Sequence, residues 1–177
     1  AFEAGTLDRW IDEATMLFDR VTAGPVIAIG SSMGGWIALH LALRRPERVA
    51  AVVGIAAAPD FTEWGFSEHL KRRLAGGETL RRASQYGGEQ VTTAGFWSSG
   101  QRLCLLESQI GIDCPVRLVH GDKDEDVPVD VAFRQKAALR SADVHVTVMK
   151  DGGHRLSAPC EIDAFRQLVA GLLEPSQ

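Results

Sequence analysis

The sequence predicts an α/β fold in which a parallel sheet carries helices on both faces. Four short apolar runs, rich in Val, Ile and Ala, indicate strands, and segments with helical periodicity lie between them. These runs span residues 26–29, 49–55, 116–119 and 144–149. Runs that are apolar at nearly every position are typical of parallel strands buried on both faces. The alternation of strands and helices predicts right-handed crossovers within one domain of 177 residues.

The first helix is expected over residues 7–21, with Thr6 as a candidate N-cap and Gly24-Pro25 beyond its end. Its apolar residues recur at the spacing of one helix face: Leu7, Trp10, Ile11, Ala14, Leu17, Phe18 and Val21. Further helices are expected at about 33–45, 130–139 and 161–173. The first of these is apolar nearly all round, which predicts burial against the sheet.

A G-x-S-x-G pattern at residues 30–34 joins the first strand to the second helix. This spacing predicts a nucleophile elbow, a strained turn that exposes the hydroxyl of Ser32. Gly30 and Gly34 are expected to let the strand and the helix pack closely. Ser31 lies one position early, on the strand side of the turn. The backbone N–H of Met33, directly after the serine, is the expected oxyanion donor.

The segment from about 60 to 113 is too long for a simple crossover between consecutive strands. We expect it to form a helical cap over the active site. Its large side chains either line an acyl pocket or pack the cap onto the domain: Phe61, Trp64, Phe66, Leu70, Leu74, Tyr86, Phe96 and Trp97.

A loop rich in acidic residues follows the third strand. Asp122, Asp124 and Asp126 compete for the role of the acid that orients a histidine and stabilises its cationic form. The D-x-x-V-P spacing favours Asp124, because Val127-Pro128 then fixes the turn out of the loop. Asp60, just beyond the second strand, is an alternative location for this acid.

The candidate general base is His154, in a glycine-containing loop after the last strand. The other histidines occupy less suitable places. His40 and His145 lie within a helix and a strand, His69 lies in the cap, and His120 adjoins the acidic loop, where it is placed to support that loop by hydrogen bonding.

Serine, acid and histidine in this chain order, each just past a strand, predict an α/β-hydrolase fold. In that fold several strands precede the elbow, so we expect an N-terminally truncated chain. The second oxyanion donor is expected from a loop after one of those strands. Loss of one such donor costs about 10²–10³ in rate, so we expect the chain as written to be a weak catalyst.

The bulk composition excludes several other classes. A net charge of −4 disfavours a nucleic-acid partner, and no apolar run is long enough to span a bilayer. Three cysteines without C-x-x-C spacing disfavour a disulfide framework or a zinc site. We expect a cytoplasmic protein without a metal or an organic cofactor.

The chain resembles the mitochondrial palmitoyl-protein thioesterase (mycophenolic acid acyl-glucuronide esterase) family of α/β-hydrolases and its bacterial homologues. The resemblance runs from Gly5 to the C-terminal helix, and its more particular motifs are Ser31-Ser32-Met33-Gly34-Gly35-Trp36 and Cys114-Pro115-Val116-Arg117-Leu118. It implies a serine hydrolase that cleaves acyl esters or thioesters through an acyl-serine intermediate, with Ser32, Asp124 and His154 as the triad. The alternatives are a non-catalytic scaffold of this fold, or a hydrolase that uses the same triad on other C–O or C–C bonds.

Overall fold

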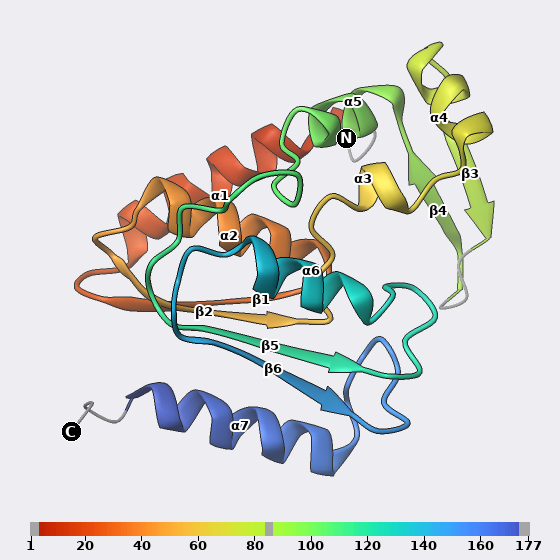
Figure 1. Ribbon diagram of the computed structural model, residues 1–177. Helices are drawn as coiled ribbons and strands as arrows, with labels where there is room; N and C mark the ends of the chain where they lie inside the picture. The colour runs from red at the N-terminus through yellow and green to blue at the C-terminus, as the bar shows by residue number, and fades with distance from the viewer. Residues whose placement is uncertain (1–3, 84–86, 174–177) are drawn as a thin grey trace.

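The computed structural model describes residues 4–83 and 87–173. Its centre is a four-stranded parallel sheet with strand order β1-β2-β5-β6 (Figure 1). The strands are β1 (Val26–Ser31), β2 (Val49–Ile55), β5 (Val116–Gly121) and β6 (Val144–Met149). All three neighbouring pairs are parallel, which confirms the predicted sheet.

Helices cover both faces of this sheet. Figure 1 shows α1 (Leu7–Val21), α2 (Met33–Arg44) and α6 (Asp130–Ala138) on one face, with α7 (Pro159–Leu173) on the other. The main core cluster includes Leu39 of α2 and Val52, Val116 and Leu118 of the sheet, none of them more than 2% exposed. Burial of each such side chain contributes about 1.5–3 kcal/mol.

The buried face of α1 differs from the predicted one. Leu7, Ile11 and Phe18 are buried as expected, but Leu17 and Val21 are 54% and 74% exposed. Thr15 is buried instead, and its hydroxyl donates a hydrogen bond to the carbonyl of Ile11. The helix is therefore rotated towards Thr15, which a purely apolar pattern does not reveal.

The segment between β2 and β5 is not the wholly helical cap that we expected. It contains α3 (Phe61–Trp64), α4 (Glu68–Ala75) and α5 (Ala94–Gln101), together with an antiparallel hairpin of β3 (Leu80–Ala83) and β4 (Glu89–Thr92). The hairpin strands are short and largely exposed, so they carry little of the apolar alternation that identifies a strand. Gly87 and Gly88, between them, have φ values of 92° and 77°, which glycine adopts without strain. Tyr86, a candidate cap residue, lies outside the described residues.

The carboxyl ends of the four strands meet at one edge of the sheet because the strands are parallel. Ser32 follows β1, Asp60 lies beyond β2, the acidic loop follows β5, and His154 follows β6. Figure 1 shows the cap elements α3, α5 and β4 gathered near this edge. The fold thus brings four distant parts of the sequence to one place.

Candidate active site

Ser32 occupies a strained turn between β1 and α2. Its φ of 52° and ψ of −123° lie in a region that non-glycine residues rarely adopt. Its N–H donates to the carbonyl of Ile55 at 2.9 Å, and its carbonyl accepts from Ala58 at 3.0 Å and from Gly35 at 2.9 Å. Strain of this kind costs about 1–3 kcal/mol, and these hydrogen bonds hold the turn in place.

The glycines that permit this turn are Gly30 and Gly35. A Cβ on Gly30 would lie 2.1 Å from the carbonyl oxygen of Gly34, and a Cβ on Gly35 would lie 2.4 Å from Cβ of Ala57. A Cβ on Gly34 would meet nothing within 4 Å, so the expectation that Gly34 allows close packing was wrong. The G-x-S-x-G motif contains Gly34, but the glycine of α2 with no room for a Cβ is Gly35, where α2 passes the segment after β2.

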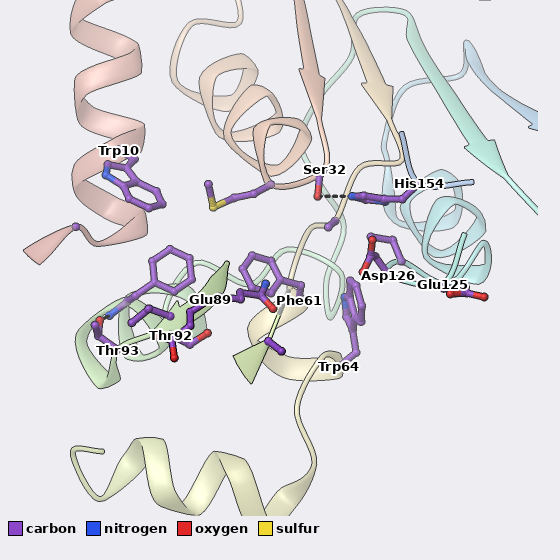
Figure 2. Close-up of a pocket in the computed structure, with 18 of the residues that line it drawn as sticks. Trp10, Ser32, Phe61, Trp64, Glu89, Thr92, Thr93, Glu125, Asp126 and His154 are labelled. Atoms are coloured by element: carbon purple, nitrogen blue, oxygen red, sulfur yellow. Dashed lines mark hydrogen bonds between the residues drawn. The ribbon is translucent and has the colours of Figure 1, made fainter. Parts of the chain in front are cut away.

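Three of the predicted site residues form a continuous chain of hydrogen bonds. Ser32 Oγ lies 3.1 Å from Nε2 of His154 (Figure 2). Nδ1 of His154 lies 2.9 Å from Oδ2 of Asp124. Because a carboxylate only accepts, Nδ1 carries a proton, and Nε2 of the neutral ring is then free to accept the serine proton. This arrangement is suited to activating a serine hydroxyl.

Asp124 is fixed by its own loop. Its side chain is fully buried, and Oδ1 accepts hydrogen bonds from the N–H groups of Asp126 and Val127, both at 2.9 Å. Oδ2 is thereby directed at His154. Hydrogen bonds from backbone N–H groups stabilise a buried carboxylate in its charged form.

The other candidate acids have different contacts. Asp122 accepts a hydrogen bond from the N–H of Asp151 at 2.6 Å, which links the acidic loop to the histidine loop. The carboxylate of Asp60 accepts from the N–H groups of Leu105 and Leu106, at 2.7 to 3.0 Å. Burial raises the pKa of Asp60, although these two hydrogen bonds oppose the rise. Asp60 therefore anchors the returning end of the cap.

Asp126 lies beside the triad, and its interactions differ from those of Asp124. Ligand atoms of Asp124, Asp126 and His154 lie within 4.8 Å of one another, the one such group among residues 4–83 and 87–173. In this structure, however, His154 Nδ1 is bonded directly to Asp124. The geometry is that of an acid–histidine pair, in which the proton on Nδ1 occupies the position that a metal would need.

His120 supports the acidic loop from behind, as its position at the end of β5 predicted. Its Nε2–H donates to the carbonyl of Val127 at 2.9 Å and lies 3.4 Å from Oδ2 of Asp124. The ring is 1% exposed. Of the remaining histidines, His69 and His145 are exposed, whereas His40 is buried and hydrogen-bonded to Leu103.

Met33 begins α2, directly after the serine. Backbone N–H groups in the first turn of a helix have no acceptor within the helix, and the helix dipole adds a partial positive charge there. The N–H of Met33 therefore lies at the positive end of the α2 dipole, next to Ser32.

A cavity of about 700 Å³ adjoins Ser32 and His154. Its apolar lining includes Trp10, Met33, Phe61, Trp64 and Phe96. The hairpin contributes Gly87 and residues 89–92. Sequence reasoning anticipated the aromatic residues of α3 and α5 but missed Trp10 and the hairpin. Trp10 belongs to the apolar pattern of the first helix, which does not distinguish the core from a cavity, and the hairpin sequence lacks the alternation of a strand.

The cysteines lie outside this site. Cys104, Cys114 and Cys160 are all free thiols. Burial raises the pKa of Cys104 to about 12, and the nearby Asp60 carboxylate adds to the effect. Burial likewise raises the pKa of Cys114. Neither of these two thiols is activated as a nucleophile, since the thiolate is the reactive form.

Within the part of the chain that the structure describes, no helix has the length and apolar character that crossing a bilayer requires.

A family model described as alpha/beta hydrolase fold matches residues 1–76. The chain is 33% identical over 177 residues to human "Palmitoyl-protein thioesterase ABHD10, mitochondrial", and the match covers 97% of the chain and 58% of that protein. The chain therefore spans less than two thirds of the length of this curated relative.

Two solved structures are similar over nearly the whole chain. A putative hydrolase from Agrobacterium vitis S4 is 34% identical, with a TM-score of 0.90, over 98% of this chain and 71% of that one. Alpha/beta hydrolase domain-containing protein 10 from mouse is 32% identical, with a TM-score of 0.89, over 96% of this chain and 70% of that one. Both similarities extend beyond the region matched by the family model.

Proposed function

Because this chain belongs to the α/β-hydrolase family, we propose that it is a serine hydrolase that cleaves carboxylic ester or thioester bonds of acyl substrates. The observation that carries the proposal is the hydrogen-bonded series Ser32–His154–Asp124 at the wall of a cavity. The human relative is named a thioesterase, which supports the inclusion of thioesters. The substrate in this proposal is a small molecule or an acylated group.

The proposed reaction proceeds through an acyl-serine. Ser32 Oγ attacks the carbonyl carbon while its proton passes to Nε2 of His154. The negative charge that forms on the carbonyl oxygen is stabilised by the N–H of Met33 at the start of α2. When the tetrahedral intermediate collapses, Nε2 gives its proton to the departing oxygen or sulfur.

Hydrolysis of the acyl-serine completes the cycle. Water attacks the ester carbonyl as His154 removes its proton, and the same proton then returns to Ser32 Oγ as the acid departs. Asp124 keeps Nδ1 protonated and stabilises the imidazolium that forms in both halves of the reaction.

The proposal is tested with a fluorophosphonate probe, which forms a covalent bond to an activated serine. We expect the purified protein to be labelled, the Ser32→Ala variant to lose labelling, and the Ser31→Ala variant to keep it. Ser31 is the matched control because it is the adjacent residue and lies at the end of β1. Labelling that persists in Ser32→Ala would refute the assignment of the nucleophile.

A substrate panel then separates ester and thioester cleavage from other reactions of the same triad. The rates of hydrolysis are compared, at equal substrate concentrations, for p-nitrophenyl esters, for acyl thioesters and for diketones, in which a C–C bond is cleaved. The Ser32→Ala variant serves as the blank. Turnover of esters or thioesters alone is the expected result. Absence of labelling and of turnover would instead favour a non-catalytic scaffold.

A cytoplasmic location remains a prediction, and the relatives named above include a protein that its name describes as mitochondrial. Fractionation of the source cells, with an antibody against this chain, tests the location directly.

A further inference from the structure

Three aromatic rings are grouped on one side of the cavity at Ser32, where the polar residues Glu89, Thr92 and Thr93 also line it. Figure 2 shows Trp10 on one side of Ser32, and His154, Asp126 and Glu125 on the other. The rings of Trp10 and Phe96 are 5.4 Å apart between centroids, and those of Phe96 and Phe61 are 5.8 Å apart. These three rings come from α1, α5 and α3, and they form a continuous aromatic wall.

The triad determines which half of a substrate lies on which side. Nε2 of His154, which lies 3.1 Å from Ser32 Oγ, must also protonate the departing atom. The leaving group therefore lies on the side of His154, where Trp64, Glu125 and Asp126 line the cavity. The acyl group then extends the other way, towards Trp10, Phe61 and Phe96.

The aromatic wall is backed by a rigid core. Phe61 contacts Trp36 edge-on, with 5.7 Å between ring centroids, and Trp36 is fully buried with its indole N–H bonded to the carbonyl of Leu103. On α1, Leu7 and Ile11 flank Trp10 in the sequence, and both are fully buried. The N–H of Leu7 is also bonded to the Ser99 hydroxyl of α5, at 2.8 Å. An incoming acyl group therefore meets a wall that does not readily move aside.

Trp10 closes the end of this wall. Its indole packs against Gly5 so closely that a Cβ there would lie 2.6 Å from a ring carbon. With Gly5 on one side and Phe96 on the other, the indole has little room to rotate. The cavity lining includes both Gly5 and Trp10, so this contact forms part of the acyl side of the cavity.

We propose that the aromatic side of the cavity is the acyl pocket and that the Trp10 indole limits the length of the acyl group. The inference rests on the proposed hydrolase function. It assigns to this site compact acyl groups, either short, branched or cyclic, in preference to extended fatty acyl chains. Packing against the rings favours such groups because their apolar surface is removed from water.

The test is an acyl-length profile with one leaving group. kcat/KM is measured for p-nitrophenyl esters from acetate to palmitate, so that only the acyl side changes. We expect the native protein to prefer short or medium chains. In Trp10→Ala the ratio of long-chain to short-chain kcat/KM should rise about tenfold or more, since one methylene group in an apolar pocket is worth 10–200-fold.

Trp64→Ala is the matched control, because it removes the same side chain from the other side of the same cavity. It should leave the length profile unchanged. Trp10→Phe is a smaller change at the same place and should give an acyl-length profile between those of the native protein and Trp10→Ala. It replaces Trp10→Ala in the test if that variant folds poorly. A native preference for palmitate, or equal shifts in both alanine variants, would overturn the inference. Failure of the native protein to hydrolyse any ester or thioester would refute the proposed function itself, which is a separate result.

Discussion

The imidazole of His120 lies directly behind the carboxylate of Asp124, with 3.4 Å between Nε2 and Oδ2. The same nitrogen lies 2.9 Å from the carbonyl oxygen of Val127. Because both neighbours are acceptors, Nε2 carries a proton in either charge state of the ring. His120 thus contacts the turn at Asp124 and again three residues later, where the loop leaves the site.

The first prediction concerns this contact. His120→Leu leaves the buried Val127 carbonyl without its donor, at a cost of about 1–3 kcal/mol, and frees the turn that directs Asp124 at His154. Displacement of the carboxylate by about 1 Å is expected to lower kcat by about 10²-fold. His120→Gln supplies an amide N–H in place of Nε2–H and should retain most of the activity.

Steady-state kinetics and thermal unfolding of both variants provide the measurement. If His120 had a purely structural role, His120→Leu would lower the unfolding temperature without lowering kcat of the folded enzyme. Equal kcat in the Leu and Gln variants would show that the hydrogen bond has no part in positioning Asp124.

A second prediction separates Asp124 from Asp126, two of the three candidates for the acid in the acidic loop. Asp124→Asn still accepts the backbone N–H groups of Asp126 and Val127, but its amide N–H₂ then faces His154 and favours the wrong tautomer. We expect kcat to fall about 10⁴-fold, the size of effect known for this substitution in a serine protease. Asp126→Asn should reduce kcat less than tenfold, since His154 bonds to Asp124. Stopped-flow or steady-state ester hydrolysis distinguishes them, and a larger loss in Asp126→Asn would reverse the assignment.

The sequence was sufficient to predict the sheet and to predict which candidate residues meet at its carboxyl edge. Parallel strands place their carboxyl ends together, so a serine, an aspartate and a histidine that each follow a strand are expected to meet. The D-x-x-V-P spacing also separated Asp124 from Asp122, because the Val127 N–H completes the turn that holds Asp124.

The cap could not be predicted to the same degree, because its structure depends on contacts between distant segments. The hairpin strands pair with each other through residues such as Arg81 and Glu89, whose ion pair is 3.3 Å long and exposed. Neither strand has an apolar face long enough to produce a period of two. Trp10 presents a different difficulty, since helical periodicity does not say whether a residue at the margin of a face meets the core or a cavity.

A third prediction contrasts two glycines of the elbow. In Gly30→Ala the new methyl group would lie 2.1 Å from the Gly34 carbonyl, so β1 and α2 would have to separate. We expect a loss of several kcal/mol in stability, or failure to fold, together with loss of fluorophosphonate labelling. In Gly34→Ala the methyl group meets nothing within 4 Å, and labelling and stability should be nearly unchanged. Urea unfolding and probe labelling of the two variants test this prediction. If Gly34→Ala also lowered stability or abolished labelling, the need for glycine would belong to the whole G-x-S-x-G motif and not to the contact at Gly30.

The last prediction concerns the pH dependence of stability through His40. Burial lowers the pKa of His40, repulsion from Arg44 adds to this, and the hydrogen bond to the Leu103 carbonyl opposes it. The ring therefore stays neutral in the folded protein at a pH where the unfolded chain already binds the proton. Above the unfolded pKa of about 6.5, His40 has no effect on the pH dependence of stability. As the pH falls below that value, the unfolded state gains the proton first, and stability decreases by up to about 1.4 kcal/mol per pH unit until the folded pKa is reached.

The free energy of unfolding in urea, measured at about pH 7.5 and about pH 5.5, gives this decrease directly. His40→Gln is the comparison, because its amide N–H can still donate to Leu103 but binds no proton. The rest of the chain is the same in both proteins, so the difference between the two pH dependences isolates His40. The native protein should lose more stability on acidification than the variant. Parallel pH dependences would mean that the buried ring accepts a proton as readily as the unfolded chain does, contrary to the effect expected of its burial in α2.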